Sequence, residues 1–233
     1  MNNFQILVVE DDAPVRNLIT TTLRAHDYRF IASGTGEGAV MEVASHNPDI
    51  ILLDLGLPDI DGVEVIRRVR SWSNVPIIVI SARAEDNDKI DALDAGADDY
   101  LTKPFLMQEL VLRIQHLLQR TYRAELRENM SDSIQIGSRS ILLSDALIQL
   151  PDGSTLSLTA TERTILQKLI ENRGHIVTYD ALCEAVWGDG YYGYENSLNV
   201  HIRHLREKIG ENAGKPQYLI TMRGIGYKLT EAR

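Results

Sequence analysis

Three acidic side chains follow two short apolar runs of the chain. Glu10 and Asp11 come directly after Ile6–Val9, and Asp54 comes directly after Ile50–Leu53. Clustered carboxylates cannot all stay ionised without a cation, and their hard oxygen atoms suit Mg²⁺. The set therefore predicts a magnesium site if the fold brings the ends of the two runs together.

Two further polar residues follow later segments of the same kind, Ser81 after the fourth and Lys103 after the fifth. A metal that bridges a carboxylate and a phosphoryl oxygen would leave Lys103 and Ser81 to contact the remaining phosphoryl oxygens. Asp54 can then act as a nucleophile and form an acyl phosphate. A phosphatase with an aspartyl nucleophile is the rival interpretation, but that class needs a second acid where this chain has Gly56.

Polar and basic residues also recur with helical spacing between Ser197 and Ile209. The members of this face are Asn199, His201, Arg203, His204, Arg206 and Lys208. Arginine can bind guanine or phosphate, and asparagine can read adenine, so the face suits insertion into a major groove. Arg223, in a following hairpin, is placed to reach a phosphate or the minor groove. On charge alone, a solvated helix face stays open, and the histidines fit phosphate contact or packing better than metal ligation.

The elements that must position the three carboxylates, Ser81 and Lys103 alternate between strand and helix. Short, continuous apolar runs, typical of parallel strands buried on both faces, are separated by helical patterns such as Pro14–Leu23 and Val63–Val69. Five such repeats, with a last helix over Leu106–Arg123, predict an α/β fold with a doubly wound parallel sheet. Its ligand site is expected at the carboxyl ends of the strands.

The second half has a different order of elements. Short β-type segments come first, at Ile134–Ile136, Ser140–Leu143 and Leu147–Leu150. Three helices follow, over Ala160–Glu171, Tyr179–Val186 and Ser197–Ile209, and a β-hairpin over Tyr218–Thr230 closes the chain. We therefore predict one domain over residues 1–123, a polar linker over 124–133 and a second domain over 134–233.

Composition is consistent with two globular domains. The chain has 233 residues, of which 44% are hydrophobic and 24% charged. No signal peptide or membrane-spanning run is evident, and the single cysteine, Cys183, fits a reducing cytoplasm. The net charge of −9 is unevenly distributed along the chain. Ser197–Lys228 carries six basic and two acidic residues, a local positive charge that suits a phosphate-facing surface.

The first half resembles the receiver domain of response regulators. The resemblance is carried by VVEDD (Val8–Asp12), LLDLGLPDIDG (Leu52–Gly62), ISAR (Ile80–Arg83) and GADDYLTKPF (Gly96–Phe105). It implies phosphorylation of Asp54 by a sensor histidine kinase, with Asp11 as a direct and Glu10 as an indirect Mg²⁺ ligand and the Gly56 carbonyl as a further one. It also implies roles for Ser81 as the switch hydroxyl, Tyr100 as the rotating aromatic and Lys103 as the phosphate contact, and a cis Lys103–Pro104 bond. One of Asp11 and Asp12 is also expected to cap the first helix. Asp59 and Asp61 are expected to be turn and cap residues rather than ligands.

The second half is similar to the winged helix-turn-helix domain of the OmpR/PhoB family. The similar segments are LTATE (Leu158–Glu162), VWG (Val186–Gly188), VHIRHLREKIG (Val200–Gly210) and RGIGYKL (Arg223–Leu229). The resemblance makes Ser197–Ile209 a recognition helix and Tyr218–Leu229 a wing. The loop Trp187–Asn196 would contact RNA polymerase, although its tyrosines could serve only as loop packing. Asn196 and His204 replace arginines of some relatives, so base-contact rules do not transfer.

The resemblance also implies homodimerisation of phosphorylated receivers. The expected charged pairs, Lys89–Glu109, Asp99–Arg113 and Asp98–Arg120, surround an apolar patch that includes Leu93. Such a dimer would bind promoter DNA at direct repeats about one helical turn apart. The expected protein is a transcription regulator and not an enzyme, of a KdpE-like or VanR-like subfamily. A regulator that acts without phosphorylation stays the alternative.

Overall fold

The computed structural model describes residues 4–125, 133–188, 195–212 and 215–230. The chain divides into two compact units, residues 1–118 and 119–233. This division lies inside the helix that ends the first half of the chain, a few residues before the predicted end of the first domain. The predicted linker falls mostly on residues outside the described part, so its extent stays a prediction.

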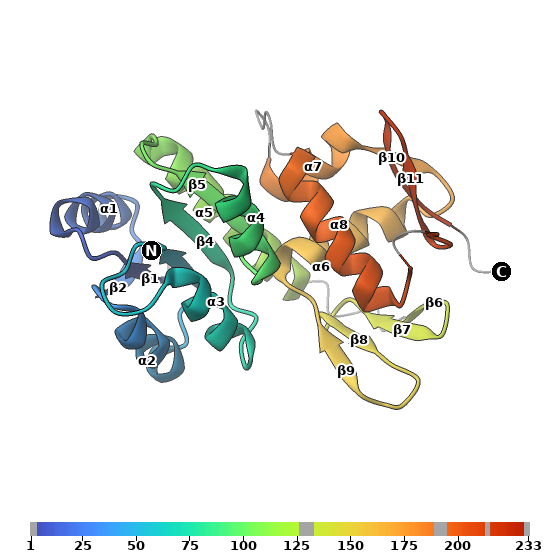
Figure 1. The fold of residues 1–233 in the computed structure, drawn as a ribbon, viewed down its shortest axis with the longest axis horizontal. Helices are drawn as coiled ribbons and strands as arrows, with labels where there is room; N and C mark the ends of the chain where they lie inside the picture. Colours follow the sequence, from blue (N-terminus) through green and yellow to red (C-terminus); the bar gives the residue numbers. More distant parts are fainter. Residues whose placement is uncertain (1–3, 126–132, 189–194, 213–214, 231–233) are drawn as a thin grey trace. The chain divides into compact units, whose positions relative to one another are not determined.

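The first unit alternates strictly between strand and helix (Figure 1). Its elements are β1 (Gln5–Val9), α1 (Ala13–Ala25), β2 (Arg29–Ser33), α2 (Gly36–His46), β3 (Ile50–Leu53), α3 (Gly62–Arg70), β4 (Ile77–Ser81), α4 (Asp86–Asp94), β5 (Asp99–Thr102) and α5 (Met107–Glu125). All four strand pairings are parallel, in the order β2-β1-β3-β4-β5. The predicted α/β class and doubly wound sheet are confirmed.

Burial explains why this sheet forms from continuous apolar runs. Every residue of β3 and β4 is buried, as expected when helices cover both faces of a parallel sheet. Helices α2, α3 and α4 lie in a row, with α3 in contact with both of its neighbours. The inner side chains of α5, Leu110, Ile114, Leu117 and Leu118, are at most 3% exposed, which confirms its predicted apolar stripe.

Aspartate carboxylates accept hydrogen bonds from the first N–H groups of three helices of this unit. Asp12 caps α1 and Asp61 caps α3, each through a hydrogen bond from a backbone N–H to the carboxylate. Asp59 accepts hydrogen bonds from the N–H groups of Gly36 and Glu37 at the start of α2. These contacts confirm that Asp12, Asp59 and Asp61 serve as turn and cap residues.

After the end of α5, the described residues of the second unit form two small sheets and three helices. Its elements are β6 (Ile134–Ile136), β7 (Arg139–Leu142), β8 (Leu147–Gln149), β9 (Thr155–Ser157), α6 (Ala160–Glu171), β10 (Ile176–Thr178), α7 (Tyr179–Trp187), α8 (Glu195–Ile209), β11 (Leu219–Met222) and β12 (Gly226–Leu229). Strands β6 to β9 form an antiparallel sheet in chain order, and β12 lies between β10 and β11 in the other sheet. This is the arrangement expected of a winged helix domain.

One hydrophobic core joins the elements of the second unit. The predicted apolar stripe of α8 is confirmed, since Leu198, Ile202, Leu205 and Ile209 are at most 2% exposed. Cys183 of α7 belongs to the same core and is 8% exposed. The predicted capping box of α6 is also confirmed: Thr159 and Glu162 exchange side-chain and backbone hydrogen bonds.

In the part of the chain that the structure describes, no helix combines the length and apolar composition that crossing a bilayer requires.

Candidate functional site

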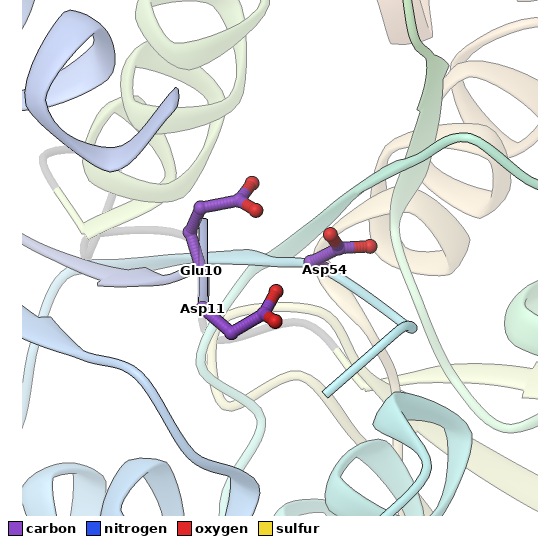
Figure 2. Close-up of side chains that lie close together, drawn as sticks. All are labelled: Glu10, Asp11 and Asp54. Atoms are coloured by element: carbon purple, nitrogen blue, oxygen red, sulfur yellow. The ribbon is translucent and has the colours of Figure 1, made fainter. Parts of the chain in front are cut away.

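The order of strands explains how the three carboxylates meet. Strand β1 pairs with β3 in a register that places Val9 beside Leu53, so the residues that follow both strands emerge next to each other. This is the point at which the strand order reverses, where ligands bind in open α/β sheets. Figure 2 shows the carboxyl groups of Glu10, Asp11 and Asp54 directed into one space, and ligand oxygens of the three lie within 4.8 Å of one another.

Lys103 neutralises part of this charge. Its Nζ donates to Asp54 Oδ2 at 2.6 Å and to Glu10 Oε2 at 2.8 Å. Burial opposes the charged form of Lys103, but these two hydrogen bonds outweigh it and raise the pKa of Lys103. Burial raises the pKa of Glu10, which is 2% exposed, against the lowering effect of Lys103. The sequence prediction that these residues converge is confirmed.

The acidic cluster fits a hard cation. Within the described part of the chain, Glu10 Oε1 is buried and has no hydrogen-bond partner. Asp11 is exposed beside it, and Asp54 has only 8% of its surface exposed. An oxygen-rich, partly open cluster with one unsatisfied carboxylate oxygen suits Mg²⁺, which keeps several water ligands.

The other predicted receiver residues surround Asp54. The Gly56 N–H donates to Asp54 Oδ1 at 3.2 Å. Ser81 is 1% exposed at the end of β4, and its hydroxyl oxygen accepts from the N–H of Arg83. The Tyr100 hydroxyl donates to the carbonyl of Arg83 at 2.7 Å, and burial raises the pKa of Tyr100. The Lys103–Pro104 bond is cis, as predicted.

Two arginines that the sequence analysis did not assign hold the loops of this site. Arg16, on α1, donates to the carbonyl oxygens of Glu10 at 2.5 Å and Asp11 at 3.1 Å. Arg83 donates to the carboxylate of Asp61 at 2.6 Å, and this contact raises the pKa of Arg83. No spacing rule identifies such contacts, because each joins a side chain to a loop whose path only the fold determines.

Two residues of the predicted dimer surface are buried inside the first unit. Leu93 is 1% and Asp98 0% exposed, and Asp98 accepts hydrogen bonds from Arg70 and from the N–H of Ile77. Their predicted place on a surface is therefore corrected. Arg70 and the backbone N–H of Ile77 bind the Asp98 carboxylate inside the unit.

The remaining predicted dimer residues are placed as follows. Arg113 donates to Asp99 at 2.6 Å and to Glu109 at 2.7 Å within the same chain. Lys89 is half-buried on α4. The side chain of Arg120 lies outside the described residues. The Asp99–Arg113 pair thus forms inside one chain, and no pairing between two chains is tested by the structure.

Helix α8 exposes only part of its predicted DNA-binding face. Asn199 and Arg203 are exposed, and Arg223 is exposed in the turn between β11 and β12. His201 is 1% exposed and lies against the ring of Trp187, with ring centroids 6.2 Å apart. The predicted DNA contact of His201 is therefore corrected, because its side chain packs inside the unit.

Arg206 braces the second unit internally. Its guanidinium donates to the carbonyl oxygen of Leu219 at 2.7 Å and to the hydroxyl of Thr221 at 2.7 Å. It also lies over the ring of Tyr227, 5.9 Å from the centroid. The side chain is 12% exposed and its described contacts are internal, so a DNA contact of Arg206 stays a prediction.

Lys208 and His204 both face a buried carboxylate. Lys208 donates to Glu162 at 2.6 Å and to the carbonyl of Ser157 at 2.9 Å. The His204 ring lies 3.8 Å from Glu162, and 16% of its side chain is exposed. These contacts tie the end of α8 to the start of α6. They leave Asn199, Arg203 and Arg223 as the most accessible members of the predicted set.

Two family models match this chain. The response regulator receiver domain matches residues 6–115, and the C-terminal domain of transcriptional regulatory proteins matches residues 153–229. The first match contains the acidic cluster, and the second contains α6, α7, α8 and the hairpin of β11 and β12.

Curated relatives extend over nearly the whole chain. The chain is 38% identical over 224 residues to the transcriptional regulatory protein KdpE of Mycobacterium tuberculosis, a match that covers 96% of this chain and 97% of the relative. It is also 38% identical over 227 residues to the KDP operon transcriptional regulatory protein KdpE of Escherichia coli, with the same coverage. The KdpE-like part of the predicted resemblance is thereby supported.

Solved structures show a similar fold. A point mutant of RitR superposes with a TM-score of 0.80 at 22% identity and covers 99% of this chain and 100% of its own. The response regulator DrrB of Thermotoga maritima, described as an OmpR/PhoB homologue, has a TM-score of 0.52 at 28% identity over 99% of this chain and 100% of its own.

Proposed function

Because this chain belongs to the OmpR/PhoB family of two-component response regulators, we propose that phosphorylation of Asp54 by a sensor histidine kinase controls its binding to promoter DNA. Members of this family are transcription factors rather than enzymes, and membership implies both a sensor kinase partner and a promoter target. The observation that carries the proposal is the convergence of Asp54, Glu10, Asp11 and Lys103 at one edge of the parallel sheet.

The chemistry is transfer of a phosphoryl group to a carboxylate. A carboxylate oxygen of Asp54 attacks the phosphorus of the kinase phosphohistidine, a P–O bond forms, and the P–N bond breaks to release the imidazole. Lys103, already 2.6 Å from Asp54 Oδ2, supplies a positive charge for the phosphoryl oxygens. Bound Mg²⁺, for which Glu10, Asp11, Asp54 and the Gly56 carbonyl are the proposed ligands, would supply further neutralisation of the phosphoryl charge.

Ser81 and Tyr100 are the proposed response elements. Both contact Arg83: the Ser81 hydroxyl accepts its N–H, and the Tyr100 hydroxyl donates to its carbonyl. A phosphoryl oxygen near Asp54 would compete for the Ser81 hydroxyl. Movement of this hydroxyl would change the segment between β4 and α4 that carries Arg83.

DNA recognition is proposed for the second unit. Helix α8 would enter the major groove, with Asn199 and Arg203 toward the bases and phosphates, and Arg223 would reach a phosphate or the minor groove. His204 and Lys208 would lie at the margin of the contact, since both also face Glu162. A role at promoters implies the cytoplasmic location that the sequence predicts. The predicted polymerase contact falls on a loop of which residues 189–194 lie outside the described part.

We further propose that phosphorylated receivers form a homodimer. Lys89 and Glu109, each partly exposed, remain candidates for ion pairs between two chains. One exposed pair contributes only about 0–1 kcal/mol, so several pairs and an apolar contact must act together. The dimer would raise the effective concentration of the second DNA-binding unit at a direct repeat.

Incubation with acetyl phosphate and Mg²⁺ tests the first step. Intact-mass spectrometry is expected to show one added phosphoryl group on the wild type and on Asp145→Ala, whose exposed side chain lies in the second unit. Asp54→Ala is expected to show none. Equal modification of Asp54→Ala would contradict the assigned site.

Binding-site selection from random DNA tests the second step, with a kdp-type promoter as a defined probe because the E. coli relative is named for that operon. Phosphorylated wild type is expected to sediment as a dimer and to enrich direct repeats. If unphosphorylated protein and Asp54→Ala bind DNA equally well as dimers, the phosphorylation-independent alternative replaces this proposal.

A further inference from the structure

A tyrosine of the hairpin fixes the most accessible asparagine of α8. The Tyr227 hydroxyl donates to Asn199 Oδ1 at 2.6 Å, across 28 residues of sequence. Tyr227 lies on β12 and is 3% exposed, whereas Asn199 is exposed. A buried group therefore holds one end of an accessible amide.

The tyrosine ring is itself immobilised. It meets the ring of Tyr179 edge-on, with centroids 5.5 Å apart and an interplanar angle of 86°. The Arg206 guanidinium lies 5.9 Å from its centroid on another side. Contacts on the ring restrict its rotation, so the position of the hydroxyl is set before any ligand arrives.

This contact decides which chemical group Asn199 presents outward. An amide has a carbonyl acceptor at one end and an NH₂ donor at the other, and either end can face a ligand if the side chain rotates. With Oδ1 accepting from Tyr227, the Nδ2 donor is directed away from the hairpin. Rotation by half a turn would replace this hydrogen bond by one from Nδ2 to the phenol oxygen, which is a weaker acceptor than the amide carbonyl, so the orientation with Oδ1 toward Tyr227 is favoured.

We infer that Tyr227 is a positioning residue for sequence specificity, which makes Asn199 a hydrogen-bond donor toward DNA. The inference rests on the proposed DNA-binding function and deepens it. It also refines the sequence prediction that Asn199 can read adenine. A bidentate contact between asparagine and adenine needs both amide atoms, and one of them is engaged by Tyr227.

The groove chemistry then defines the preferred bases. In the major groove, guanine presents N7 and O6, adenine N7 and thymine O4 as acceptors, whereas cytosine presents only its N4 donor. At the base contacted by Asn199, the wild type should therefore accept guanine, adenine or thymine and exclude cytosine. A single net hydrogen bond corresponds to a discrimination of about two- to tenfold.

Selection on random DNA with the full chain tests this assignment. Tyr227→Phe removes the hydroxyl and keeps the ring, so the amide can rotate and cytosine is expected to enter at one position of the selected site. Tyr179→Phe is the matched control, because it removes the same atom from the adjoining ring and is expected to keep the wild-type profile. An unchanged profile for Tyr227→Phe, with thermal unfolding showing that all three proteins are folded, would overturn the inference.

Asn199→Asp gives the complementary result. The carboxylate keeps an acceptor for Tyr227 but replaces the outward donor by an acceptor, so cytosine and adenine, which present the N4 and N6 donors, are expected to become the preferred bases at the same position. Continued exclusion of cytosine by this variant would also overturn the inference. If the wild type selects no sequence at all, the proposed DNA-binding function itself fails, and this outcome is distinct from an unaltered profile.

Discussion

Lys103 lies between two carboxylates, so it competes with any cation that binds there. Its Nζ donates to Asp54 and Glu10, and the same two carboxylates are proposed to hold the metal. A unit positive charge about 4 Å from a divalent cation costs roughly 2 kcal/mol even in a water-like medium. The ammonium therefore lowers the affinity for Mg²⁺ while it prepares the site for phosphoryl oxygens.

Lys103→Met is accordingly expected to bind Mg²⁺ more tightly, by roughly thirtyfold, and to accept a phosphoryl group from acetyl phosphate more slowly. Calorimetric titration measures the affinity, and intact-mass kinetics measure the transfer. Lys168→Met, on α6 of the second unit, is the control and should leave both quantities unchanged. Weaker Mg²⁺ binding by Lys103→Met would contradict the competition.

Asp59 predicts a dependence of stability on pH. The N–H groups of Glu37 and Gly36 lower the pKa of Asp59, so its stabilising effect is complete above the ordinary aspartate pKa of about 3.9 and disappears as pH falls through the lowered value. The difference in unfolding midpoint between the wild type and Asp59→Asn should be constant near pH 6 and shrink below about pH 4. A difference that grows on acidification would contradict this assignment, and Asp145→Asn is the matched control.

At the scale of elements, hydrogen bonds from side chains hold the hairpin of β11 and β12 against α8 and the residues that follow it. Arg206 binds the Leu219 carbonyl and the Thr221 hydroxyl, and Glu211 accepts from the N–H groups of Gln217, Tyr218 and Leu219. The two arginines of α8 thus differ: Arg206 contacts the hairpin inside the unit, and Arg203 is exposed.

Alanine substitutions should distinguish these two arginines. Arg206→Ala leaves the Leu219 carbonyl without two of its donors and is expected to lower the free energy of unfolding of the second unit by about 1–3 kcal/mol. Arg203→Ala, at an exposed position, should lower it less than Arg206→Ala does, while it weakens DNA binding and reduces the salt dependence by about one phosphate contact. Urea unfolding and binding titrations at several salt concentrations measure both effects. Equal destabilisation by the two variants would refute the division.

Sequence alone predicted the elements whose signals are local. The caps at Asp12 and Asp61, the capping box of Thr159 and Glu162, and the apolar stripe of α8 all depend on residues within a few positions of one another. Strands β9 and β10 were missed. Each has three residues, too few to show a period, and each is defined by pairing with a distant strand.

In the candidate site, the sequence likewise predicted the residues at strand ends but not the side-chain contacts between distant segments. Residues at strand ends converge because sheet topology brings them together, whereas the contacts of Arg16, Arg206 and Tyr227 depend on side-chain paths across the fold. Charge misled the prediction at Asp98, which was expected on a surface but is buried against Arg70. A charged residue is buried when a cation and a backbone donor are already in place to receive it.

At the scale of the whole molecule, each unit has its own core and its own tryptophan. Trp72 lies just after α3, is 49% exposed and belongs to the first unit, whereas Trp187, on α7, is 6% exposed in the core of the second. The chain has two tryptophans, so each single replacement leaves one unit to be followed by fluorescence.

Mg²⁺ should therefore stabilise one unit selectively. In Trp187→Phe, the unfolding midpoint reported by Trp72 is expected to rise with Mg²⁺, by an amount equivalent to about 2.7 kcal/mol at a concentration roughly one hundred times the dissociation constant. In Trp72→Phe, the midpoint reported by Trp187 should stay constant. A parallel rise of both midpoints would show that the units unfold together.

The single cysteine of the chain can report on the second unit alone while the protein stays folded. Cys183 is 8% exposed in the core that α7 shares with α8, so a thiol reagent reaches it mainly when that core opens. Its labelling rate then measures opening of the DNA-binding unit under conditions in which the protein stays native. Specific DNA should slow the labelling, and ligands of the receiver alone should not alter it.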